Sequence, residues 1–158
     1  MFKSVLILTA NLMALAAAPA PAEEPASAGP LDLTRRIVAT SGAAGEDSAG
    51  YLRIRNGSPV ADELTDASCV CADTIEFHRV VRTETGGNMI DDATWTVPGA
   101  GALDVRPGTN LHFMLINFDP TKAVDGRVRL TLTFRDAGTV EADFALTADS
   151  RAAWTAFD

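Results

Sequence analysis

The chain has 158 residues and a formal net charge of −8 at pH 7, because 21 Asp and Glu residues outnumber 13 Lys and Arg residues. An acidic surface argues against partners that are themselves negatively charged, namely nucleic acid and anionic membranes. The length fits one ordinary domain with enough chain to build a hydrophobic core. We therefore expect a single folded domain that does not bind nucleic acid.

The first 22 residues have the features of a secretory signal peptide. A short positive start, Met1-Phe2-Lys3, precedes an apolar stretch over residues 4–18 and two small-x-small cleavage signals that end at Ala20 and Ala22. The stretch is too short for a membrane span, although a retained N-terminal anchor is the alternative. We predict cleavage after Ala22, export to the periplasm and no membrane span afterwards. No cysteine lies near the cleavage point, which argues against a lipid-modified N-terminus.

The remaining chain begins with a leader and continues as strands. Residues 23–30 are rich in Ala, Glu, Pro and Ser, a composition typical of a flexible leader. From Leu31 onward apolar and polar residues alternate, which is the period of strands with one buried face. Residues 40–50 are small and polar and predict a loop. The expected strands are 31–39, 51–55, 64–70, 74–82, 95–97, 103–105, 111–116, 127–135 and 140–146.

This arrangement of strands indicates the fold class. Seven to nine short strands separated by regular turns, with no long helical period, are typical of a β-sandwich or a Greek-key barrel. The clearest strand is 127–135, in which apolar residues alternate with Arg and Thr. We therefore predict an all-β fold, built by residues 31–158 as one domain.

Two histidines and two methionines remain after the predicted cleavage, and all of them fall within one part of the chain. They are His78, Met89, His112 and Met114, in the pattern His-x10-Met-x22-His-x-Met. Imidazole nitrogen and thioether sulfur form a soft-to-borderline ligand set, and thioethers select Cu(I) over harder metals. Separately, such histidines would be surface residues and such methionines would fill gaps in a core. Their joint spacing indicates a Cu(I) site instead.

Local patterns place these side chains on their elements. Residues two apart in a strand point to the same face, so His112 and Met114 should project together. Met89 follows a Gly-Gly turn and is expected in a loop. Glu76 shares a strand face with His78, and it is either the group that orients the imidazole or an ordinary solvated residue.

The ligand pattern resembles that of the periplasmic copper chaperone family of the PCu(A)C or DUF461 type, in which the middle spacing is one residue shorter. The segments 51–57, Pro107-Gly108 and 130–134 also fit the framework of that family. The resemblance implies a cupredoxin-like fold, Cu(I) as the bound metal and the four residues above as its ligands. It further implies delivery of copper to the binuclear copper centre of cytochrome c oxidase subunit II. We expect a monomeric carrier.

No constellation for catalysis is visible in the chain. Both histidines are already assigned to the metal site, and there is no Gly-rich phosphate loop. We therefore expect a carrier and not an enzyme. Two alternatives remain open: a copper-scavenging or tolerance protein with the same site and no oxidase target, and a metal-free β-sandwich interaction module.

The two cysteines form a separate Cys69-Val70-Cys71 motif. In an extended strand their Cα atoms would lie about 6.5–7 Å apart, at the upper limit for a disulfide, and a turn beginning at Cys71 would shorten that distance. The motif is thus a local disulfide, a pair of buried or free thiols, or a second metal site. The main site should not depend on it.

Overall fold

A computed structural model describes residues 23–84 and 86–155 of the chain, so the predicted signal peptide lies outside the described residues. This part of the chain is nearly all β. Besides its strands, it contains a 3-10 turn, η1 (Pro120–Lys122), and one short helix, α1 (Ser150–Thr155). Within these two ranges no helix is long and apolar enough to cross a membrane.

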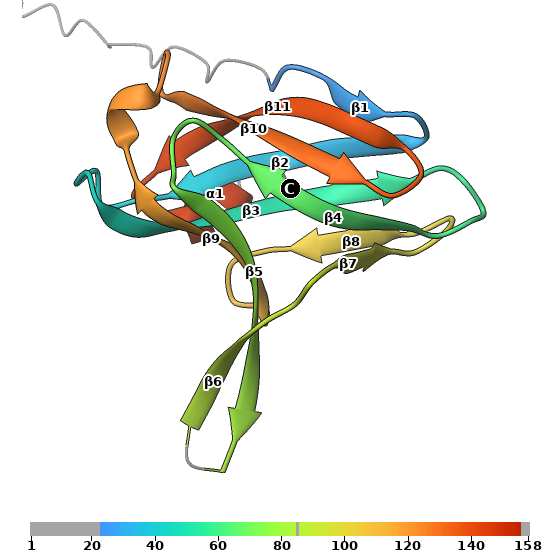
Figure 1. Ribbon diagram of the computed structural model, residues 1–158, viewed down its shortest axis with the longest axis horizontal. Coiled ribbons are helices and arrows are strands. Elements are labelled where there is room, and N and C mark those ends of the chain that lie inside the picture. Colours follow the sequence, from blue (N-terminus) through green and yellow to red (C-terminus); the bar gives the residue numbers. More distant parts are fainter. Residues whose placement is uncertain (1–22, 85, 156–158) are drawn as a thin grey trace, which may run out of the picture.

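The strands form one curled sheet (Figure 1). Their bounds are β1 Ala26–Ala28, β2 Leu31–Ala39, β3 Glu46–Asn56, β4 Asp62–Ser68, β5 Thr74–Thr83, β6 Gly86–Asp91, β7 Trp95–Val97, β8 Ala102–Val105, β9 Leu111–Phe118, β10 Arg127–Phe134 and β11 Gly138–Thr147. The order is β6-β5-β9-β3-β2-β11-β10-β4-β7, with β1 added to β2 and β8 added to β3. Strands β2 and β11 are parallel, and the other pairs are antiparallel.

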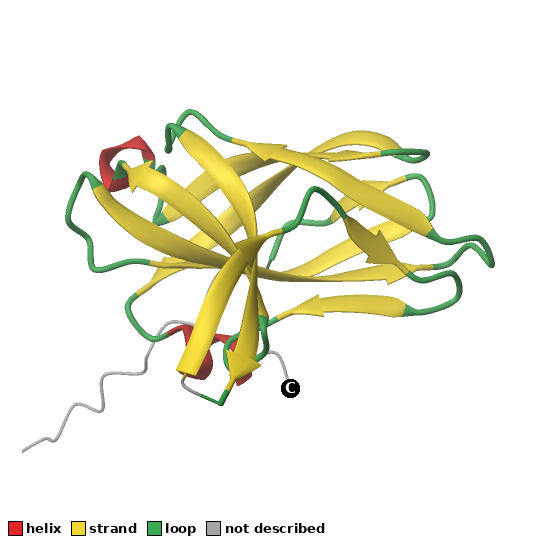
Figure 2. Cartoon of the chain, turned by 60° about the horizontal axis from the view of Figure 1, so that its bottom comes forward, coloured by secondary structure: helices red, strands yellow, loops and turns green. Residues whose placement is uncertain are grey.

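The buried faces of strands that are far apart in this order meet in one core. Phe77 of β5 stacks on Trp95 of β7 with ring centroids 4.8 Å apart, although β5 and β7 stand near opposite ends of the hydrogen-bonding order. Phe113 of β9 lies 5.1 Å from the same Trp95 ring. The sheet therefore folds over onto itself around aromatic side chains, and Figure 2 shows the strands on both sides of this core. The predicted all-β sandwich or barrel is confirmed.

Strand β3 begins earlier than the sequence predicts, because residues 40–50 are not wholly a loop. The strand starts at Glu46. Within it Gly50 faces Phe113 and Leu115, and a Cβ atom placed on Gly50 would lie 3.2 Å from each of these side chains. A strand segment that passes such bulky neighbours must carry small residues. The apolar alternation that marks a strand is for that reason missing from this part of the sequence.

Strand β6 is a second difference from the prediction. It pairs with β5 in a hairpin that projects from the body of the molecule (Figure 1), so Met89 lies in a strand and not in a loop. Every residue of β6 is exposed. With no buried face, the strand leaves no alternation in the sequence by which it could be recognised.

The segment 23–30, expected as a flexible leader, contains a strand. Ala26–Ala28 pair with Leu31–Leu33 of β2, and the side chains of Ala26 and Ala28 are buried. Composition alone could not indicate this, because small residues such as alanine suit both a solvated leader and a tightly packed edge strand.

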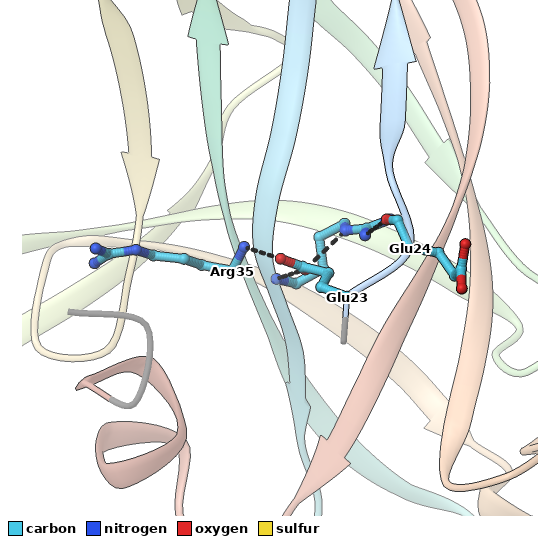
Figure 3. A network of polar contacts seen from close by, with 4 residues as sticks. Glu23, Glu24 and Arg35 are labelled. Atoms are coloured by element: carbon cyan, nitrogen blue, oxygen red, sulfur yellow. Dashed lines mark hydrogen bonds and ion pairs between the residues drawn. The ribbon is translucent and has the colours of Figure 1, made fainter. Parts of the chain in front are cut away.

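Just before β1, an ion pair holds the chain against β2. The Arg36 side chain is only 1% exposed, and its Nε donates a 2.9 Å hydrogen bond to Oε1 of Glu23. The Glu23 carboxylate also accepts hydrogen bonds from the backbone N–H groups of Arg35 and Arg36, at 3.1 and 2.9 Å. Arg36 further donates to the backbone carbonyl of Glu24. Figure 3 shows the Glu23 carboxylate contacting the backbone of Arg35 and the Glu24 carboxylate pointing away from this contact.

Candidate metal centre

Two neighbouring strands, β5 and β9, form the platform of the site. Phe77 lies directly opposite Phe113, and Ile75 lies opposite Leu115. All four side chains are buried in the core. Because successive strand residues point to opposite faces, the residues between them project from the other face of the sheet. Core packing therefore determines on which face the histidines lie.

The two histidines meet on that outer face. His78 of β5 is the direct cross-strand partner of His112 of β9, and their rings are 5.5 Å apart, centroid to centroid, with an interplanar angle of 80°. Met114 follows His112 by two residues on the same face and lies opposite Glu76. The register thus brings three of the four predicted ligands into adjacent positions.

Met89 lies on the opposite flank of the histidine pair. Met89 is on β6, and its cross-strand partner is Val80 of β5, which follows His78 by two residues on the same face. Diagonal neighbours of this kind lie about 7–8 Å apart, a distance that long side chains can bridge. Met89 is 59% exposed. The structure therefore brings it onto the same face but on the outer hairpin, whereas Met114 lies on an inner strand.

Two carboxylates contact one ring nitrogen of His78. Its Nε2 atom lies 2.8 Å from Oε2 of Glu76 and 3.0 Å from Oδ1 of Asp91. The other ring nitrogen, Nδ1, is buried and has no hydrogen-bond partner among the described residues. The contact with Glu76 agrees with the orienting role considered from the sequence. The structure adds a second acidic group that the sequence reasoning missed.

The hairpin register explains why Asp91 was missed and how it could have been found. Asp91 is the direct cross-strand partner of His78 across the β5–β6 turn. It is separated from His78 by thirteen residues in sequence, with no local motif that links them. A reading that treated residues 86–91 as the return strand of a hairpin would have placed the two residues side by side.

Burial favours the neutral form of the second histidine, His112. Desolvation is the main cause that lowers the pKa of His112 below its ordinary value, and the neighbouring His78 adds to this by repulsion of like charges. A histidine must be neutral to bind a metal through a ring nitrogen. The environment of His112 therefore favours the ligand form of the side chain near neutral pH.

The two cysteines form a disulfide, as one of the three predicted alternatives proposed. Cys69 and Cys71 are joined, with their Cα atoms 5.1 Å apart. The bond closes the connection between β4 and β5, beyond the end of β5 at which Thr74 pairs with Ile116. Because neither thiol is free, this oxidised form cannot offer thiolate ligands to a metal.

Comparisons with known proteins agree with the geometry. A scan against protein families matches the LpqE-like lipoprotein family over residues 18–146. No curated protein matches the chain in a sequence search.

Similar folds are found among solved structures. A copper-bound PCuAC domain from PmoF2 has a TM-score of 0.65 at 18% identity, covering 80% of this chain and 99% of that domain. The apo PCuAC domain from PmoF1 scores 0.62 at 18% identity, with coverages of 80% and 100%. Apo-DR1885 from Deinococcus radiodurans scores 0.53 at 20% identity, with coverages of 92% and 97%. At these identities the likeness establishes a shared cupredoxin-like fold.

Proposed function

Because the chain belongs to the LpqE-like family, and because its histidines and methionines gather on one face of a PCuAC-like fold, we propose that it is a copper carrier that binds Cu(I). The observation that carries the proposal is the cross-strand pair His78–His112, with Met114 beside it and Met89 on the adjoining hairpin. Copper is the cargo in this proposal.

The donor atoms suit a soft, singly charged cation. Two imidazoles and two thioethers carry no net charge, so Cu(I) is bound without an accumulation of anionic ligands. Thioethers also persist in an oxidising compartment, where thiols tend to be lost to disulfides. The disulfide at Cys69–Cys71 is what such a compartment would produce. The buried Nδ1 atom of His78 has no hydrogen-bond partner among the described residues, and it can bind a metal when it carries no proton.

The placement of the ligands supports transfer as well as binding. His112 and Met114 lie on β9, which is hydrogen-bonded on both sides, to β5 and β3, and is anchored by buried Phe113 and Leu115. This half of the site is preorganised. Met89 lies on the exposed edge strand β6 and has three rotatable side-chain bonds. It can leave the metal when a receiving protein offers its own ligand.

We extend the proposal to compartment and partner. The predicted signal peptide supports export to the periplasm, where the mature chain would act as a monomeric carrier and not as an enzyme. The resemblance to PCu(A)C proteins supports delivery to the binuclear copper centre of cytochrome c oxidase subunit II. Scavenging of copper without an oxidase target is the second candidate. If the protein delivers copper to the oxidase, deletion of its gene should lower cytochrome c oxidase activity in cells grown at low copper. If it only scavenges copper, the deletion should leave that activity unchanged.

A Cu(I) titration of the mature protein tests the central proposal. We expect one Cu(I) per chain in competition with a colorimetric chelator, and the same stoichiometry after both cysteines are replaced by serine. The matched control is a variant that lacks the histidine pair, His78→Ala/His112→Ala. Equal uptake by that variant, or loss of uptake in the serine variant, would refute the proposed site. No uptake by the unmodified protein would instead support a metal-free interaction module.

A further inference from the structure

The two ring nitrogens of His78 have contrasting surroundings. Nε2 contacts the carboxylates of Glu76 and Asp91 at 2.8 and 3.0 Å. Nδ1 is buried without any hydrogen-bond partner among the described residues. Buried polar atoms are rarely left unpaired, and each unpaired atom calls for an explanation. The side chain as a whole is 11% exposed, so solvent is not an ample substitute.

The surroundings determine where the ring proton resides. Ionised carboxylates can only accept hydrogen bonds, so two of them around Nε2 require that this nitrogen carry the proton. Metal binding requires the neutral imidazole, which has a single N–H group, so that its other nitrogen presents a lone pair. A proton on Nδ1 would instead be a buried donor without an acceptor. The geometry of His78 is therefore that of a ring whose Nδ1 lone pair is kept free.

We propose that Asp91 and Glu76 act together as positioning residues that make Nδ1 of His78 the copper-ligating atom. This inference rests on the proposed function and specifies the atom through which one ligand acts. Metal-bound histidines commonly donate their second N–H group to a carboxylate, which fixes the orientation of the ring and increases its basicity. Neither acid needs to touch the metal.

Asp91 has a further consequence through its strand. It lies on β6, two residues from Met89 on the same face. Its contact with His78 therefore also links β6, which carries Met89, to β5, which carries His78. Loss of Asp91 should disturb both the ring orientation and the position of Met89, whereas loss of Glu76, on the same strand as His78, should disturb only the ring.

Direct binding of a divalent cation by the acidic groups is the competing explanation. One ligand atom each from Glu76, His78 and Asp91 lies within 4.8 Å of the others. A cation at that point would need the lone pair of Nε2 and would move the proton to Nδ1, where no acceptor is available. The structure thus favours hydrogen bonding over metal binding at Nε2, and the two possibilities make different predictions.

The test compares Cu(I) affinity between variants by chelator competition. Glu76→Gln/Asp91→Asn removes both carboxylates and should weaken Cu(I) binding about 10- to 100-fold. Asp91→Glu keeps a carboxylate and should retain most of the affinity. Glu84→Gln is the matched control, because Glu84 is an exposed acid of the same hairpin with no contact to His78. It should change the affinity less than about twofold.

Nitrogen-15 NMR of labelled histidine supplies the second measurement. In the apo protein the His78 proton should be on Nε2, and Cu(I) should shift the resonance of Nδ1. Unchanged affinity in the double variant, or a Cu(I)-induced shift at Nε2, would overturn the inference while leaving the proposed function intact. The inference would also be overturned if the unmodified protein bound Zn²⁺ and the double variant lost this binding while its affinity for Cu(I) stayed the same. Failure of the unmodified protein to bind Cu(I) would instead refute the proposed function and the ligand assignment with it.

Discussion

Removal of the negative charge of Glu23 should destabilise the mature protein, and it should do so more than removal of the charge of the neighbouring Glu24. Glu23 is the anionic partner of Arg36, whose side chain is 1% exposed. The variant Glu23→Gln keeps the size of the side chain but removes the charge. Arg36 would then remain buried without its counterion, because a guanidinium cannot lose its proton in a protein.

The structure sets the expected magnitude. Breaking a buried ion pair from one side typically costs about 3–5 kcal/mol. Two features favour the lower end. Glu23 is itself 17% exposed. The pKa of Asp143 is lowered mainly by its hydrogen bond from Arg129, and the positive charge of Arg36 adds a smaller contribution, so Arg36 has a second carboxylate within its electrostatic reach. We therefore expect a loss of about 3 kcal/mol, which for a chain of this size corresponds to roughly 10 °C in Tm.

Thermal unfolding of the mature protein, followed by circular dichroism, measures this effect. Glu24→Gln is the matched control, because Glu24 offers Arg36 its backbone carbonyl and not its carboxylate. Its Tm should stay within about 2 °C of the unmodified protein. Glu23→Gln/Arg36→Met should recover most of the loss, since an apolar side chain of similar length no longer needs a counterion. Equal Tm values for Glu23→Gln and Glu24→Gln would refute the reasoning.

Three further predictions follow from the sequence and the site. N-terminal sequencing of exported protein should begin near Glu23, and an intact Met1 would contradict the signal peptide. Met114→Leu should weaken Cu(I) binding more than Met89→Leu in chelator competition, because Met114 is held on an inner strand, and both apo variants should keep their Tm; a silent Met114→Leu would contradict this order. The hydrogen bond from Arg53 is the main cause that lowers the pKa of Asp104 below its ordinary value. The stabilising effect of this ion pair is therefore present above the ordinary pKa of an aspartate and is lost as pH falls through the lowered pKa. Asp104→Asn should therefore reduce the difference in Tm between neutral pH and about pH 3, and an unchanged difference would show that the ion pair contributes nothing measurable.

The sequence alone carried much of the local information. Alternation with a period of two identified β5 and β9 and implied that His112 and Met114 share a face, because side-chain direction in a strand depends only on parity. The chemistry of the ligands was equally local, since two imidazoles and two thioethers indicate a soft metal wherever they meet. The resemblance to the PCu(A)C family rested on spacing along the chain and needed no coordinates.

Only the tertiary structure decided which residues become partners across strands. Asp91 reaches His78 through the register of a hairpin, and Glu23 reaches Arg36 through the docking of β1. Neither pair has a sequence signal, because the register between strands is set by long-range packing and turn geometry together. The exposed strand β6 could not be predicted for a related reason. Because none of its residues is buried, its pairing with β5 produces no alternation of apolar and polar residues in the sequence. Local periodicity determined the faces of the strands, and long-range packing determined which atoms those faces bring together.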